Sequence, residues 1–201
     1  MPGQKAPEEA RREQILAAAY EVAKREGIAG LTLRAVAAEA KLSHGLVLFH
    51  FKRKEQLVSE LLDRVVAETL DLRVSEEIGR IPRALDRFRA LVRQEMDRLA
   101  HEPDRVRVLL ECWALGAREP ALRESVGAAL ERYRAAFRPT AQDVLRDEPA
   151  GFSEMTPDGL ASVTAGLVHA CAIQAMVDPE RFRMEEYLAA VQSLVARLGA
   201  T

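Results

Sequence analysis

The chain has 201 residues, of which 48% are hydrophobic and 30% are charged. This balance is typical of a soluble globular protein and argues against a disordered chain. No run approaches the roughly 18 apolar residues that a membrane-spanning helix needs, and the charged first residues do not resemble a secretory signal. Two cysteines, Cys112 and Cys171, are too few for a disulfide framework, so we expect a reducing, cytoplasmic location.

The net charge of −2, taken alone, argues against a nucleic-acid partner. The charge is unevenly distributed, however, because residues 1–54 carry ten Lys/Arg against six Asp/Glu and the remainder is acidic. A basic head on an acidic body indicates that a polyanion would bind only the N-terminal part of the chain.

Apolar residues recur with helical spacing along the chain, and no convincing alternating strand appears. The pattern predicts an all-α fold of about nine helices, a small three-helix N-terminal bundle being followed by a larger C-terminal one. Gly27 is expected to end the first helix, and Pro139 is expected to kink or split the seventh. The predicted helices cover about 9–26, 33–40, 44–51, 54–72, 81–99, 104–118, 121–146, 160–177 and 185–198.

The second and third predicted helices have the layout of a helix-turn-helix, two short helices joined by a tight turn. Val47 and Phe51 are the only core anchors of the third helix, so most of its surface is free to enter a major groove. Gly45 is a poor helix former that would let the backbone approach a partner closely. Thr32 and Ser43 stand at helix N-termini, where N–H groups suit phosphate oxygens.

The segment from residue 11 to 57 reads RREQILAAA, then GIAGLTLRAVAAEA, then LSHGLVLFHFKRKEQL. Its combined pattern T-x-x-x-V-A, S-x-G, H-F and K-E-x-L resembles the DNA-binding domain of the tetracycline-repressor (TetR) family over about residues 9–69. The resemblance implies an all-helical homodimer that binds double-stranded operator DNA, with a ligand-binding and dimerisation domain over 75–201. In the family an occupied ligand site releases the operator, so the resemblance implies a repressor that responds to a small molecule.

Carried over by position, the resemblance implies that Thr32 and Ser43 cap their helices, and that Gly45 lets the recognition helix approach DNA. It also implies that His50 and Lys54 contact the DNA backbone. The expected DNA-binding residues are Thr32, Arg34, Lys41, Ser43, His44, Gly45, Leu46, Leu48, Phe49, His50 and Lys54.

Three positions depart from the family pattern. Lys41 stands where the turn usually has Gly, so a left-handed conformation there would cost about 1 kcal/mol. Leu48 replaces a Tyr whose hydroxyl binds phosphate in the family. Leu46 can pack only on a thymine methyl or a sugar, which leaves His44 and Arg34 as the best polar candidates for base readout. The departures leave the operator sequence open.

The run from Gly166 to Phe182, followed by a last amphipathic helix, resembles the penultimate helix of BetI-type members. In the family this pair of helices meets its symmetry mate in a four-helix bundle. Small side chains would permit close approach of the helices, and the apolar residues exceed what one small core needs. The expected dimer-interface residues are Ala161, Ala165, Leu167, Ala172, Ala175, Leu188, Val191 and Val195.

A ligand pocket is expected on the helices that surround the pocket in the family. A mostly apolar cavity with a few polar groups suits a small molecule, and no cofactor or metal ion is expected. Glu111 near Trp113 would admit a cation through charge and cation–π attraction, whereas an uncharged apolar or acyl ligand fits equally well. The expected ligand-binding residues are Phe88, Glu111, Cys112, Trp113, Tyr133, Phe137 and His169.

Other functional classes stay open on the sequence. The motifs H-E-x-x-H, C-x-x-C and G-x-S-x-G and a phosphate-binding glycine loop are absent from the sequence, which disfavours a helical enzyme. A thiol-based redox sensor would use Cys112 or Cys171, and a helical protein-binding module is a third alternative. The sequence determines neither the inducer, nor the target genes, nor the sign of the regulation.

Overall fold

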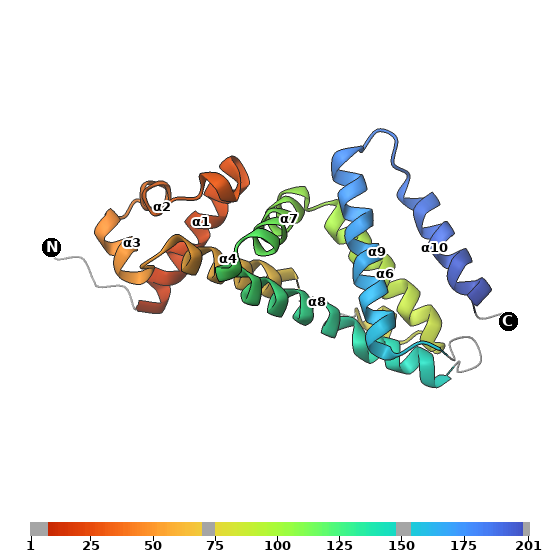
Figure 1. Ribbon diagram of the computed structural model, residues 1–201. Coiled ribbons are helices and arrows are strands. Elements are labelled where there is room, and N and C mark those ends of the chain that lie inside the picture. The colour runs from red at the N-terminus through yellow and green to blue at the C-terminus, as the bar shows by residue number, and fades with distance from the viewer. Residues whose placement is uncertain (1–7, 70–74, 148–153, 199–201) are drawn as a thin grey trace. The chain divides into compact units, whose positions relative to one another are not determined.

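The computed structural model describes residues 8–69, 75–147 and 154–198, and these ranges form ten α-helices and no strand (Figure 1). The predicted all-α class is confirmed, whereas the predicted number of nine helices is too small by one. The helices are α1 (Glu8–Gly30), α2 (Leu33–Glu39), α3 (His44–His50), α4 (Lys54–Thr69), α5 (Glu76–Gly79), α6 (Ala84–Ala100), α7 (Pro103–Arg118), α8 (Pro120–Asp147), α9 (Pro157–Val177) and α10 (Met184–Leu198).

The helix that was not predicted from the sequence is α5, a single turn with one buried apolar side chain, Ile78. Such a short element has no helical periodicity to recognise. The sequence nevertheless carries a signal for its start, a serine followed by two acidic residues, Glu76 and Glu77. In the structure the Ser75 hydroxyl accepts a hydrogen bond from the Ile78 N–H at 3.3 Å and caps the helix.

Of the two outcomes expected at Pro139, the split is wrong, because α8 runs through it as one helix from Pro120 to Asp147, and the kink stays a prediction. Pro139 lies on the exposed side of the helix. Water can therefore hydrate the carbonyl that loses its N–H partner there, and this lowers the cost of an interior proline.

By their internal contacts the residues fall into two compact units. Unit 1 comprises Met1–Glu68 and Arg107–Ala129, and unit 2 comprises Thr69–Val106 and Leu130–Thr201. The boundaries between the units fall at the end of α4 and within α7 and α8. The division predicted from the sequence, a DNA-binding domain over 9–69 and a ligand-binding and dimerisation domain over 75–201, is defined by function and stays a prediction.

The core of unit 1 is built on the apolar face that the sequence predicts for the first helix, with Ile15, Ala19, Val22 and Ala23 all fully buried. The two anchors expected for the third helix, Val47 and Phe51, are also buried. The remaining large buried side chains of the unit include Ile28, Leu31, Val36, Leu57, Leu61 and Val65.

The helical conformation of α1 is broken at Gly27, which has φ 71° and ψ 172°. This region of φ and ψ is essentially restricted to glycine. A Cβ at this position would also lie 2.8 Å from Oε2 of Glu111 on α7. The same carboxylate accepts a hydrogen bond from the Ile28 N–H at 2.5 Å, so the end of α1 is held against α7. Gly27 was expected to end the first helix, and the helical conformation does break there, although α1 continues to Gly30.

Replacing this glycine tests both constraints. Gly27→Ala is expected to lower the free energy of unfolding by about 2–3 kcal/mol, measured by urea denaturation, because the new methyl group strains the backbone and displaces Glu111. The matched control is Gly127→Ala in α8, where a Cβ would meet nothing within 4 Å. That change should instead raise stability by up to about 1 kcal/mol, because alanine is the better helix former. Equal effects at the two positions would refute this explanation.

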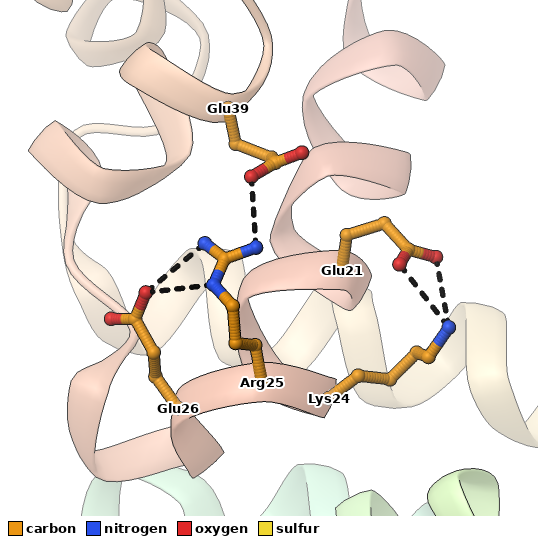
Figure 2. A network of polar contacts seen from close by, with 5 residues as sticks. All are labelled: Glu21, Lys24, Arg25, Glu26 and Glu39. Atoms are coloured by element: carbon orange, nitrogen blue, oxygen red, sulfur yellow. Dashed lines mark hydrogen bonds and ion pairs between the residues drawn. The ribbon is translucent and has the colours of Figure 1, made fainter.

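A surface network joins α1 to α2 (Figure 2). The Arg25 guanidinium lies between Glu26, at 3.0 Å, and Glu39 of α2, at 3.1 Å. Its hydrogen bond to Glu26, followed by that to Glu39, raises the pKa of Arg25 above its ordinary value. The three side chains are accessible to solvent, so the network orients α2 more than it stabilises the fold.

In unit 2, α9 lies beside α6 (Figure 1). By length and composition α9 is apolar enough to cross a membrane, with mean hydropathy 1.6, which corrects the expectation that no run approaches this. One face of α9 is buried in the unit, through residues that include Leu160, Ala165 and Val168. Its apolar composition is therefore that of a helix contributing to the core of a helical bundle.

Candidate functional site

The caps predicted for the two short helices are both present. The Thr32 hydroxyl accepts a hydrogen bond from the Ala35 N–H at 3.1 Å and begins α2. The Ser43 hydroxyl accepts one from the Leu46 N–H at 3.2 Å and begins α3. These bonds satisfy N–H groups that the helices leave unpaired, and they fix where α3 starts.

Lys41, which stands where the family pattern usually has glycine, is left-handed in the turn between α2 and α3, with φ 56°. Two hydrogen bonds offset the strain at this lysine. The Leu42 N–H donates to the Ala37 carbonyl at 2.9 Å, and the Gln14 side-chain amide of α1 donates to the Ala40 carbonyl at 2.9 Å. The turn is thus held from both sides without a glycine.

One face of α3 is exposed and consists of His44, Gly45, Leu48 and Phe49, at helical spacing. Phe49 is 71% exposed and Leu48 is 43% exposed. A Cβ at Gly45 would meet nothing within 4 Å, so the fold itself does not require glycine there. An exposed apolar surface on a short, capped helix fits contact with apolar groups of a partner, such as thymine methyls in a major groove.

His50 is the one expected DNA-binding residue whose side chain is buried, with 8% exposed. Its carbonyl oxygen accepts a hydrogen bond from Arg12 at 3.0 Å, and Arg12 also pairs with Glu60 of α4 and lies over the Phe51 ring. The structure therefore directs the His50 side chain into unit 1. Arg12 positions the end of α3, and no local sequence pattern distinguishes it from other surface arginines.

The other expected DNA-binding residues remain accessible. Leu46 and Lys54 are half-buried, and the Lys54 ammonium donates to the Ala29 carbonyl at 3.2 Å. Lys54 therefore has to exchange this bond to reach a phosphate. The exposed members are Thr32, Arg34, Lys41, Ser43, His44, Gly45, Leu48 and Phe49.

The expected ligand-binding residues divide between the two units. Unit 1 contains Glu111, Cys112 and Trp113, and unit 2 contains the rest. In unit 2 the Tyr133 ring stacks on His169 at 4.4 Å between centroids and meets Phe137 edge-on at 5.5 Å. These three side chains form an aromatic cluster, and Phe88 is buried in the same unit.

Glu95 of α6 extends this cluster and was missed by sequence reasoning. Its side chain is 1% exposed, and it accepts hydrogen bonds from Arg98 at 2.6 and 2.9 Å and from the Tyr133 hydroxyl at 3.1 Å. Burial, followed by the Glu95 charge, raises the pKa of Tyr133 well above its ordinary value. The available signal was a carboxylate on the apolar face of the predicted helix, in step with Leu91 and Leu99.

His169 makes the stability of the fold depend on pH. Burial lowers the pKa of His169 to about 4, whereas an unfolded histidine titrates at 6.5. Between these values the unfolded chain binds more protons, so the stability present above pH 6.5 is lost as the pH falls. We expect His169 to account for about 2 kcal/mol of the stability lost between pH 7 and pH 5.

The measurement is chemical denaturation at both pH values for the wild type and His169→Gln. The variant should lose about 2 kcal/mol less over this interval than the wild type. His101→Gln, at an exposed histidine, is the control and should lose as much as the wild type. If His169→Gln lost as much stability between pH 7 and pH 5 as the wild type, His169 would not be the source of this pH dependence.

Both thiols are buried, which disfavours the redox-sensing alternative. Burial, with a smaller contribution from Glu111, raises the pKa of Cys112 to about 12. Burial, with a smaller contribution from Asp97, raises the pKa of Cys171 to about 11. The reactive thiolate is therefore scarce at both positions. Within residues 8–69, 75–147 and 154–198, no three side chains of metal-ligating type gather at one place.

Comparison with known proteins gives two family matches. Residues 15–61 match the model of bacterial regulatory proteins of the TetR family, and residues 84–200 match that of the BetI-type transcriptional repressor C-terminal domain. An HTH-type transcriptional repressor of Mycobacterium tuberculosis is 41% identical over 85 residues, which are 41% of this chain and 45% of the relative. The chain thus aligns with less than half of that relative's length.

Three further comparisons cover most of the chain. The BetI regulator of Stenotrophomonas maltophilia is 28% identical over 165 residues, covering 81% of this chain and 82% of the relative. Among solved structures, a regulator from Pseudomonas aeruginosa has TM-score 0.79 at 21% identity, covering 98% of this chain and 93% of that one. A regulator from Saccharomonospora viridis, solved in complex with choline, has TM-score 0.72 at 21% identity, with 94% and 97% covered. The chain belongs to the TetR family of transcriptional regulators and carries a BetI-type C-terminal domain.

Proposed function

We propose that this DNA-binding regulator is a cytoplasmic repressor that binds a pseudo-palindromic operator as a homodimer and is released by a small molecule. The exposed face of the capped helix α3 is the observation that carries the proposal. The name of one relative, a transcriptional repressor, and the BetI-type repressor model that matches residues 84–200 support the same sign of regulation. Membership of a family of regulators favours this function over the enzyme alternative.

In this proposal the two kinds of DNA contact come from different side chains. Thr32, Ser43 and Lys54 would contact phosphates and set the register of the protein on the duplex. His44 and Arg34 would offer polar contacts to base edges, and Phe49 would pack on apolar groups in the major groove. The exposure of Phe49 supports a recognition surface that is more apolar than polar.

The proposed dimer uses α9 and α10, with a modified set of residues. Ala161, Ala165, Ala172 and Leu188 are buried within the single chain, so they offer little surface to a partner. Leu167, Ala175 and Val191 are half-buried, and the side chain of Val195 lies outside the described residues. Large apolar side chains are exposed on these helices at Val163, Val177 and Leu194, with 59%, 70% and 64% exposed. These three favour α9 and α10 as the interface.

The proposed effector is a small, mostly apolar molecule that binds in unit 2 without any cofactor. The aromatic cluster of Tyr133, Phe137 and His169, with the Glu95 carboxylate beside it, supports this location. The choline held by the regulator from Saccharomonospora viridis supports a small-molecule effector as a class.

The proposed DNA-binding roles of Lys54 and His44 are tested by replacing each of them with alanine. Lys54→Ala should weaken binding to all DNA sequences alike and reduce the slope of log affinity against log salt by about one unit, because one phosphate contact is lost. His44→Ala should instead change the preferred sequence, with a cost of about 1–3 kcal/mol at the affected base pair. Binding is measured by fluorescence anisotropy at several salt concentrations on an operator and on random DNA.

The control for these variants is their own fold, since Lys54 also bonds the Ala29 carbonyl. Circular dichroism and denaturation should show that both variants remain folded. An unchanged sequence preference in His44→Ala would remove His44 from the reading residues, and an unchanged salt slope in Lys54→Ala would remove its phosphate contact.

A further inference from the structure

Unit 1 contains a pocket of about 410 Å³ that is distinct from the proposed effector site, whose aromatic cluster belongs to unit 2. It lies between the end of α1, the start of α4, the last turns of α7 and the start of α8. Its apolar lining comes mainly from Ile28, Val58, Leu115 and Leu122, three of which are buried. This volume is in the range of pockets that hold a small organic molecule.

Hydrogen bonds between distant parts of the chain hold the walls of this pocket in place. The Ile28 N–H donates to Glu111 at 2.5 Å, and the Lys54 ammonium donates to the Ala29 carbonyl at 3.2 Å. Nearby, the hydroxyls of Ser59 and Ser125 are 2.7 Å apart and join α4 to α8. A pocket fixed in this way needs little ordering when a ligand enters.

The charged groups around the pocket favour a cation. Three carboxylates, Glu55, Glu111 and Glu119, line it together with a single ammonium, that of Lys54. The three carboxylates outnumber this ammonium, whose hydrogen bond to the neutral Ala29 carbonyl leaves its charge in place. The pocket therefore combines an apolar lining with a net negative charge.

We propose that this pocket binds an amphiphilic cation, with its apolar body against Ile28 and Leu122 and its ammonium group beside Glu111 and Glu119. The site goes beyond the proposed function, because the aromatic cluster of the proposed effector site belongs to unit 2. Trp113, the single tryptophan of the chain, follows Glu111 by two residues and precedes Ala114, a residue that lines the pocket. Its fluorescence therefore reports on occupancy.

The test compares two probes with the same aromatic body and opposite charge, 4-phenylbutylammonium and 4-phenylbutyrate. Each is titrated into the full chain without DNA, with tryptophan fluorescence and calorimetry as readouts. The ammonium probe is expected to bind saturably and about tenfold or more tightly than the carboxylate probe. Equal affinity for the two probes, or binding of neither, would overturn the proposal.

Variants locate the binding. Glu111→Gln keeps an oxygen that accepts from the Ile28 N–H while it removes the charge, and Glu119→Gln changes an exposed residue. Together they should weaken the ammonium probe about tenfold or more, and Ala114→Leu should weaken both probes by filling space. Glu124→Gln, at an exposed position of α8 outside the pocket, should have no effect.

If the double variant fails to fold, Glu119→Gln and Ala114→Leu decide the question. Unchanged affinity for the ammonium probe in both of these variants rejects the site. The titrations contain no DNA. Their failure would therefore leave the repressor function standing, and a failure of DNA binding would leave the pocket standing.

Discussion

Arg98→Met is expected to lower the free energy of unfolding by about 3–5 kcal/mol, the largest stability effect of any change considered. Arg98 neutralises Glu95, whose side chain is 1% exposed, through hydrogen bonds at 2.6 and 2.9 Å. Without the guanidinium, the carboxylate remains in the core of unit 2, where the neutral Tyr133 hydroxyl that donates to it cannot replace the lost positive charge. Thermal and urea denaturation measure the loss.

Two further variants separate charge from packing in this prediction. Arg80→Met breaks an ion pair with Glu76 whose side chains are 75% and 86% exposed, and it should cost less than about 0.5 kcal/mol. Adding Glu95→Gln to Arg98→Met removes the buried charge but keeps an acceptor for Tyr133. The double variant should recover at least half of the loss. If Arg98→Met costs no more than Arg80→Met, the Glu95 carboxylate does not need its partner.

Leu194→Asp is expected to raise the dimer dissociation constant by about 100-fold or more, because a charge would be buried at the proposed interface. Leu194 is 64% exposed on α10 in the single chain. Operator affinity should fall with it, since two half-sites no longer bind one linked pair of recognition helices. Sedimentation velocity over a range of protein concentrations measures the dimer, and anisotropy measures DNA binding.

Gln192→Asp is the matched control, because it adds the same charge at an exposed position of the same helix. It should leave the dimer and the fold unchanged. A Leu194→Asp variant that sediments as the wild-type dimer would exclude this part of α10 from the interface. An unfolded variant would be recognised by circular dichroism, and Val177→Asp on α9 would then carry the test.

The recognition region was predictable because its signals are local. A serine or threonine before an apolar run marks a helix start, and Thr32 and Ser43 both act as the caps that this rule implies. The family pattern usually has glycine in this turn, which marked Lys41 as the residue that a left-handed conformation would strain, and its φ is 56°. Such features depend on a few neighbouring residues and little on the rest of the fold.

Features that depend on distant contacts could not be predicted in the same way. His50 is buried at the end of α3, where Arg12 of the distant helix α1 donates to its carbonyl and lies over the Phe51 ring. Ala161, Ala165 and Ala172 of α9, expected at a dimer interface, are already buried within the single chain, because a close-packed core and a close-packed interface select the same side chains. The spacing of apolar residues shows that one face of a helix is buried. It does not show whether that face packs against the same chain or against a second copy.

Footprinting tests the central claim most directly. The full chain would first select its preferred sites from random double-stranded DNA, and the selected DNA would then be footprinted. We expect protection of two inverted half-sites whose centres lie about 10–10.5 base pairs, or a multiple of this, apart. Protection of a single asymmetric half-site, or the absence of any preferred sequence, would contradict a dimeric operator-binding repressor.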